Sequence, residues 1–203
     1  MRVTESVRIC FEVSTVVFKL DITGSVQIRS LQERDAEEFF ELVQANIYRL
    51  SKWCPWLEEV DTVEKTVQYL RGKIERYQTG DGPSCGFFDN GRLVGFIALE
   101  YVDKRNLVTE IGYWLDEKVE GRGLVTAACV NLIGYSFEHL RLERVQIRCA
   151  VENVRSRAIP EKLGFKIEGI LRRSERLRDR TVDLAVYGML RSEWIWLSHR
   201  RAA

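Results

Sequence analysis

The sequence has few residues that are able to hold a transition metal. It contains only two histidines, His139 and His199, and none of its five cysteines forms a Cys-x-x-Cys pair, so a zinc site has no cluster of ligands. The cysteines are also scattered and odd in number, which is typical of reduced thiols in a cytosolic protein rather than of a disulfide framework. We therefore expect no bound metal and a cytoplasmic location.

An excess of one charge and a long apolar run are also lacking. The chain has 31 Lys and Arg against 30 Asp and Glu, whereas a dedicated nucleic-acid-binding protein is usually basic overall. Its longest apolar run, Leu93 to Leu99, is far too short to span a bilayer. Glu5 and Glu12 interrupt the N-terminal segment, so we expect no signal peptide. From these absences we expect no nucleic-acid partner and no membrane partner.

The length and the apolar content favour one folded domain. A chain of 203 residues buries about 70% of the surface that its unfolded form exposes, so it needs no disulfide or metal to build a core. A prior of about 150 residues per domain also favours a single domain. We expect residues 26–198 to form this domain, with residues 1–25 as an N-terminal extension of unassigned role.

The pattern of apolar residues predicts a mixed α/β domain. From residue 26 onward it indicates one strand, two helices, three strands, a helix, a strand, a helix and two strands. Apolar residues recur at helical spacing through residues 36–50, with Asp35 as the N-cap and Glu38 as its capping-box partner. Asn90-Gly91 separates two strand-like runs and predicts a β-hairpin.

The most informative stretch is a predicted strand, residues 107–115, followed by a glycine-containing turn, residues 120–123, and a helix. Two nearby glycines let backbone N–H groups converge on an anion. The N-terminus of the helix adds unpaired donors and a favourable dipole. A phosphate or pyrophosphate is the expected ligand, with a simple structural corner as the alternative. The sequence has neither a P-loop nor a dinucleotide-binding fingerprint.

Longer motifs around this turn resemble the GNAT superfamily of N-acetyltransferases. Within it, they are most similar to the RimJ/RimL group, which acetylates protein N-termini, including those of ribosomal proteins. The resemblance covers about residues 26–195 and is carried by Glu110-Ile111-Gly112-Tyr113-Trp114-Leu115, Glu120-Gly121-Arg122-Gly123-Leu124, Cys149-Ala150-Val151-Glu152-Asn153-Val154-Arg155-Ser156 and Leu163-Gly164-Phe165-Lys166-Ile167-Glu168-Gly169. It implies a mixed sheet of about seven strands with a V-shaped split, flanked by about four helices.

The resemblance also implies where acetyl-CoA binds. The exposed backbone near Leu115 would pair with the pantetheine like an added strand, because splayed strands leave backbone groups that an amide-bearing ligand can satisfy. Asn153 would hydrogen-bond the pantetheine arm, and Ser156 would lie beside it. The loop over residues 120–125 would hold the pyrophosphate through backbone N–H groups; its residues are Glu120, Gly121, Arg122, Gly123, Leu124 and Val125.

The proton donor departs from the general pattern of the superfamily. Many members use a tyrosine in the last short helix to serve the departing thiolate, but that position is Pro160 here. Ser156 is the remaining hydroxyl nearby, and RimL-like members use a serine there. The resemblance therefore implies that Ser156 donates the proton or stabilises the thiolate. A proline inside this helix also predicts an irregular helix at the site.

The proton acceptor is left open between two carboxylates, Glu168 and Glu110. Resemblance to RimL-like enzymes favours Glu168, with Cys149 close by, whereas Glu110 stands in the strand that leads to the loop. Glu168 has an alternative interpretation as a solvated strand residue. Alternation along residues 145–151 places Cys149 on an apolar face, which favours a buried structural thiol over a catalytic one.

The activity implied is direct transfer of an acetyl group from acetyl-CoA to a primary amine, and a protein N-terminus is the first candidate acceptor. The alternatives are a small-molecule amine, such as a polyamine, an amino acid or an antibiotic, and a non-catalytic CoA-binding or ribosome-associated module. Homodimers are common in the resembling group, so we expect a homodimer. Trp53 and Trp56, in the aromatic cluster of residues 53–57, could line a substrate groove or a dimer interface, or they could pack at helix ends. The five arginines of residues 172–180 could form a solvated loop or a clamp for an acidic partner.

Overall fold

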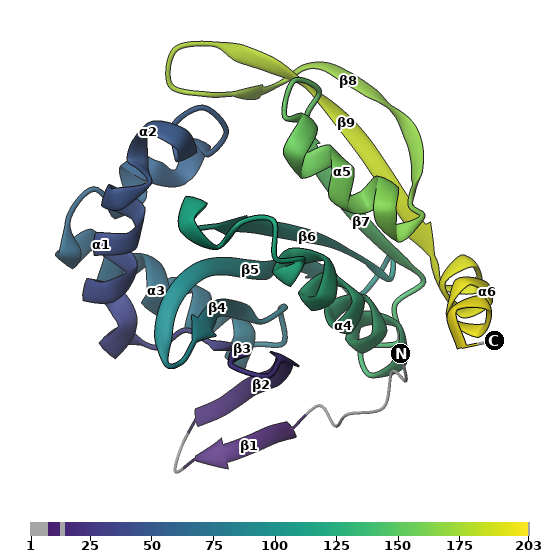
Figure 1. Cartoon of the computed structure of the whole chain (residues 1–203), viewed down its shortest axis with the longest axis horizontal. Coiled ribbons are helices and arrows are strands. Elements are labelled where there is room, and N and C mark those ends of the chain that lie inside the picture. Colours follow the sequence, from purple (N-terminus) through teal and green to yellow (C-terminus); the bar gives the residue numbers. More distant parts are fainter. Residues whose placement is uncertain (1–7, 13–14, 203) are drawn as a thin grey trace.

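One sheet organises the residues that this computed structural model describes, 8–12 and 15–202 (Figure 1). In the described residues it has nine strands, which lie side by side in the order β1 (Arg8–Glu12), β2 (Thr15–Thr23), β3 (Val26–Ser30), β4 (Ser84–Asp89), β5 (Arg92–Asp103), β6 (Val108–Leu115), β7 (Arg144–Ala150), β9 (Thr181–Leu190) and β8 (Lys166–Arg176). The helices are α1 (Ala36–Ala45), α2 (Ile47–Leu50), α3 (Val63–Gln78), α4 (Leu124–Glu138), α5 (Val154–Leu163) and α6 (Arg191–Ala202). Short 3₁₀ turns are η1 (Glu33–Asp35), η2 (Pro55–Val60) and η3 (Glu117–Val119).

The sheet splits between β6 and β7. These two strands are parallel, and they pair only where Val108, Thr109 and Glu110 face Arg144–Gln146. Every other neighbouring pair of strands is antiparallel within the described residues. Beyond Glu110 the two strands diverge, as Figure 1 shows, and each keeps a backbone edge without a strand partner. The predicted mixed α/β fold with a V-shaped split is confirmed.

Helices cover both faces of the sheet and enclose two apolar clusters. On one face α4 buries Ala128, Leu132 and Ile133 against the central strands. On the other face α1 and α3 contribute Phe39 and Leu70 to a second cluster. In β6 and β7 the side chains of successive residues point to opposite faces of the sheet.

The sheet is larger than the seven strands expected, because it extends into the N-terminal segment. β2 pairs with β3, and within the predicted extension the side chain of Phe18 is fully buried. The ring of Phe18 meets the edge of Tyr135 of α4, with centroids 4.8 Å apart. Apolar burial of this kind is the main favourable term in folding.

The predicted helix over residues 36–50 is interrupted at Asn46. Asp35 is the N-cap residue of α1, as predicted, but its side chain makes no capping hydrogen bond. The carboxylate of Asp35 accepts two hydrogen bonds from Arg29, at 2.7 and 2.8 Å, and one from the backbone N–H of Gln32, so it does not cap α1. Glu38 accepts from the backbone N–H of Leu93 at 2.8 Å instead of closing a capping box. The carboxylate of Asp35 is thus bound to residues just before the helix, and that of Glu38 to a strand 55 positions away.

Candidate active site

The glycine turn after β6 opens onto free space. Gly121 and Gly123 have φ angles of +76° and +75°, and a Cβ built on either residue would meet no atom within 4 Å. The first helical hydrogen bond of α4 runs from the N–H of Ala127 to the carbonyl of Gly123, at 3.0 Å. The amides from Leu124 to Thr126 therefore have no intrahelical acceptor. Together with the dipole of α4, this arrangement suits a phosphate group.

The end of β6 presents its backbone to the split. The N–H of Asp116 donates to the carbonyl of Val94 in β5, at 2.8 Å. In a trans peptide the C=O and the N–H point in opposite directions, so the carbonyl of Leu115 points away from β5, toward the split. That carbonyl accepts a hydrogen bond from the guanidinium of Arg49 in α2.

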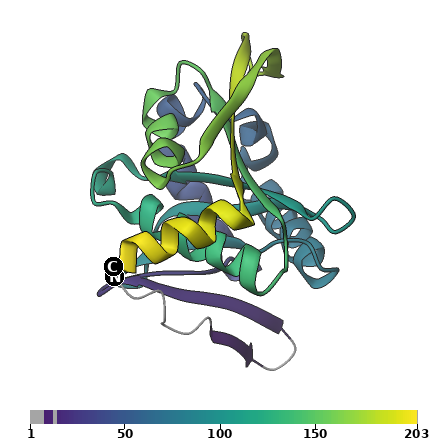
Figure 2. The same cartoon turned by 90° about the vertical axis from the view of Figure 1, so that its right-hand side faces the viewer.

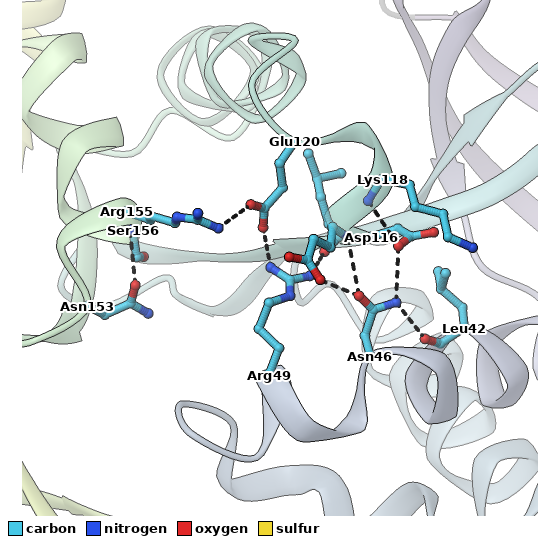
Figure 3. A network of polar contacts seen from close by, with 11 residues as sticks. Leu42, Asn46, Arg49, Asp116, Lys118, Glu120, Asn153, Arg155 and Ser156 are labelled. Atoms are coloured by element: carbon cyan, nitrogen blue, oxygen red, sulfur yellow. Dashed lines mark hydrogen bonds and ion pairs between the residues drawn. The ribbon is translucent and has the colours of Figure 1, made fainter.

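A chain of polar contacts crosses the mouth of the split (Figure 3). One carboxylate oxygen of Glu120 binds Arg49 from α2, and the other binds Arg155 in the first turn of α5, at 2.7 Å. The side chain of Asn46, where the first helix is interrupted, accepts from Arg49 at 3.1 Å and from the N–H of Glu117 at 3.2 Å. These contacts connect α2, the glycine turn and α5.

Asn153, Ser156 and Cys149 lie together where β7 passes into α5. Asn153 caps α5, since its side-chain oxygen accepts from the N–H of Ser156 at 3.2 Å. The hydroxyl of Tyr113 donates to the carbonyl of Ser156 at 2.9 Å. Cys149 is buried, as strand alternation predicted. Burial raises the pKa of its thiol to about 11, although a hydrogen bond with the side chain of Ser156 partly opposes this rise.

Glu110 lies where the split begins. It is the last residue of β6 that pairs with β7, and its side chain is 11% exposed. Its carboxylate accepts from Arg148 at 2.6 Å and from Gln146 at 2.9 Å. Arg148 precedes Cys149 in β7, so Glu110 and Arg148 lie on the face of the sheet opposite to Cys149.

Glu168 lies far from Ser156. Its carboxylate forms a two-pronged ion pair with Arg144, the first residue of β7. Asn153 follows the other end of that strand, and a strand of seven residues is about 20 Å long. The structure therefore brings Ser156, Asn153 and Cys149 together, but it does not bring Glu168 to them.

Comparison with known proteins decides the family. A family model described as "Acetyltransferase (GNAT) domain" matches residues 25–166. The chain belongs to the GNAT acetyltransferase family. This confirms the resemblance found in the sequence, and the split sheet with its glycine turn is the GNAT fold.

Several GNAT relatives are named for ribosomal proteins. The chain is 38% identical over 181 residues to the "Putative ribosomal N-acetyltransferase YdaF" of Bacillus subtilis (strain 168), which covers 88% of this chain and 98% of the relative. It is 28% identical to the "Ribosomal-protein-serine acetyltransferase" of Escherichia coli (strain K12), covering 84% and 96%. A solved structure of the microcin C7 self-immunity acetyltransferase MccE, in complex with acetyl-CoA and AMP, has a TM-score of 0.79 at 24% identity and covers 88% and 97%.

One carboxylate of this GNAT domain, Glu175, does not stand out as a site residue in the sequence. Glu175 of β8 pairs with Val182 of β9, two residues before Leu184, which pairs with Ala150 at the end of β7. Glu175 therefore lies at the Asn153 end of the split. Burial raises the pKa of Glu175, the positive charge of Arg148 opposes this rise, and the negative charge of Glu110 adds to it.

A weak signal for Glu175 was present in the sequence, since it is the only glutamate among the arginines of residues 172–180. Its orientation depends on an irregularity in the pairing of β8 with β9, between Leu171 and Glu175. A shift of register changes the face on which a side chain lies. Counting residues along the strand therefore could not place Glu175.

The hairpin of β8 and β9 extends beyond the rest of the sheet (Figure 2), and its tip lies beside the segment that follows α2 (Figure 1). The guanidinium of Arg180 lies 5.4 Å from the ring centroid of Trp53 and pairs with Glu152 at 2.9 Å. Trp53 also packs against a small apolar cluster formed by Ala150, Leu177, Val182 and Leu184. Trp56 is stacked on Tyr69 in the apolar cluster instead, which favours the packing interpretation for that residue.

Two further findings concern the described residues only. None of their helices is long and apolar enough to cross a membrane. No group of three or more histidine, cysteine, aspartate or glutamate side chains among them is arranged to hold a metal ion.

Proposed function

We propose that this GNAT enzyme transfers the acetyl group of acetyl-CoA to the α-amine of a protein N-terminus. The observation that carries the proposal is the unpaired backbone edge of β6, which ends beside the open turn at Gly121 and Gly123. The names of the relatives support a protein acceptor. A homodimer and a cytoplasmic location stay predictions.

The residues at the split fit acetyl-CoA. The amides of residues 121–126, at the positive end of α4, are suited to the pyrophosphate. The backbone of Tyr113 and Leu115 is suited to the amides of the pantetheine, as in strand addition. Asn153 uses its side-chain oxygen to cap α5, so its amide nitrogen is the group that would donate to the pantetheine.

The proposed proton transfers use the two faces of the sheet. Ser156 lies on the face of Cys149, and Glu175 lies with Glu110 and Arg148 on the opposite face. A thioester held in the split would lie between them. Glu175 accepts the proton of the attacking amine as the carbon–nitrogen bond forms. Ser156 gives a proton to the sulfur as the carbon–sulfur bond breaks, and exchange with water then returns a proton to Ser156 and removes the one held by Glu175.

The charges near Glu175 suit this role. Arg148 is hydrogen-bonded to Glu110, and its positive charge also acts on Glu175. Among the described residues only Glu110 is paired with this guanidinium, and the carboxylate of Glu175 has no ion pair of its own. Such a site attracts a protonated amine, and a carboxylate with a raised pKa is a better proton acceptor near neutral pH.

An acetyl-transfer assay tests the proposal. The purified chain would be given acetyl-CoA and either a peptide with a free N-terminus or the same peptide with an acetylated N-terminus and an internal lysine. Release of CoA with the first peptide alone is the expected result. Turnover with polyamines or amino acids, but with no peptide, would favour a small-molecule acceptor. Binding of acetyl-CoA without turnover for any amine would favour the non-catalytic alternative.

The glycine turn gives a prediction for binding. Gly123→Val should weaken acetyl-CoA binding by roughly tenfold, because a side chain at φ +75° forces the turn to change shape at a cost of about 1–2 kcal/mol. Isothermal titration calorimetry measures the change. Gly91→Val is the matched control, since Gly91 has a φ of +81° and equally open surroundings in the hairpin between β4 and β5. Equal loss of affinity in both variants would contradict the assignment of the turn.

A further inference from the structure

The carboxylate of Glu120 occupies an unusual position, because two arginines from opposite sides of the split bind it (Figure 3). Arg49 comes from α2 and Arg155 from α5. Glu120 belongs to the turn whose amides the proposed function gives to the pyrophosphate. A negatively charged side chain therefore lies where a negatively charged ligand is expected.

Arg49 is held in this position by more than its ion pair. Its guanidinium also donates to the carbonyl of Leu115 and, at 3.1 Å, to the side chain of Asn46. Its Nε atom is buried and has no hydrogen-bond partner within the described residues. The cation would therefore stay at the mouth of the split if Glu120 moved away.

Arg155 is bound much more loosely. Its side chain is 78% exposed, and its contact with Glu120 is its only ion pair among the described residues. Ion pairs at this exposure contribute little to stability. Arginine binds phosphate and carboxylate with the same planar set of N–H donors. A phosphate can thus replace the carboxylate of Glu120 on both arginines without a loss of hydrogen bonds.

We infer that Arg49 and Arg155 form an anion-binding position for a phosphate group of acetyl-CoA, and that Glu120 fills this position until the ligand arrives. The inference rests on the proposed function and adds to it. Glu120 then competes with the ligand, and its displacement breaks the contact that joins α2 to α5 across the split.

The competition predicts that a substitution in the binding site improves affinity. Glu120→Gln should tighten acetyl-CoA binding by about fivefold, because the amide no longer holds the two guanidinium groups. Arg155→Gln should weaken binding by about tenfold, because a hydrogen bond to a charged phosphate is lost. Calorimetric titration at fixed salt concentration measures both changes, and it does not depend on turnover.

Glu117→Gln is the matched control. Glu117 lies in the same loop and has no ion pair among the described residues. Its substitution by glutamine removes the same charge. Unchanged affinity in Glu117→Gln, beside the gain in Glu120→Gln, supports the inference. Equal gains in both variants would show a general charge effect and would overturn it, as would an unchanged or weaker affinity in Glu120→Gln.

Shortened ligands identify the phosphate. A gain in Glu120→Gln that is lost with acetyl-dephospho-CoA assigns the 3′-phosphate. A gain that persists there but is lost with S-acetylpantetheine assigns the pyrophosphate. A gain that persists with S-acetylpantetheine would overturn the inference, since that ligand has no phosphate. Failure of the wild-type chain to bind acetyl-CoA would instead contradict the proposed function.

Discussion

Glu175→Gln is expected to lower kcat by about 100-fold or more, because the attacking amine loses its proton acceptor. The Kd for acetyl-CoA should stay unchanged, since Glu175 lies on the face of the sheet opposite to Ser156, near Glu110 and Arg148. Steady-state kinetics with a saturating peptide acceptor, together with calorimetric titration of acetyl-CoA, separates the two quantities.

Glu168→Gln is the matched control for this prediction. It makes the same change in the same strand, but Glu168 pairs with Arg144 at the far end of β7. We expect near wild-type turnover from it. A large loss in Glu168→Gln with little loss in Glu175→Gln would restore the assignment that the family resemblance favoured. A comparable loss in Glu110→Gln would indicate that the two carboxylates near Arg148 act together.

The pH profile tests the same role independently. Burial raises the pKa of Glu175. As the pH falls, its carboxylate therefore becomes protonated at a pH above the ordinary pKa of a glutamate. The acceptor amine, with a pKa near 8, already gives log(kcat/KM) a slope of about one below that pH. In the wild type the slope should steepen to about two once Glu175 protonates. Glu175→Gln should keep a slope of one throughout.

Ser156→Ala should also lower kcat by about 100-fold with the acetyl-CoA affinity retained, because the departing thiolate then loses its proposed proton donor. The substitution leaves the backbone N–H of Ser156, which Asn153 caps, and the carbonyl that Tyr113 binds. The helix should therefore stay in place, which circular dichroism and a thermal melt can check.

Cys149→Ala controls for the packing around Ser156. The serine hydroxyl hydrogen-bonds the Cys149 thiol, so each variant removes that contact from one side. A purely structural role would lower kcat to a similar degree in both. Loss in Ser156→Ala alone supports proton donation. Unchanged turnover in Ser156→Ala would mean that water protonates the thiolate.

Local patterns predicted the parts of the site that depend on neighbouring residues. The two glycines predicted a turn that opens a helix, and alternation along β7 placed Cys149 on the buried face. The family motifs supplied the split itself, because the divergence of β6 and β7 is a property of the whole sheet.

Features that depend on long-range contacts were not predictable in this way. Glu175 reaches its place through an irregular register in β8, and a register shift leaves no mark in the apolar pattern. The contact between Arg49 and Glu120 joins residues that are 71 positions apart. The interruption at Asn46 likewise involves the distant Glu117, so helical periodicity alone extended the first helix too far.

The short pairing between β6 and β7 has a consequence for the lifetime of the folded chain. Six strands lie on one side of this junction and three on the other, and three residue pairs connect them. Acetyl-CoA, bound as proposed, forms hydrogen bonds in the split, where β6 and β7 do not pair, and so connects the two halves of the sheet. At a concentration of 100 times Kd, such a ligand adds about 2.7 kcal/mol to the free energy of unfolding. The resistance of this enzyme to proteolysis would then rise and fall with the cellular supply of its own substrate.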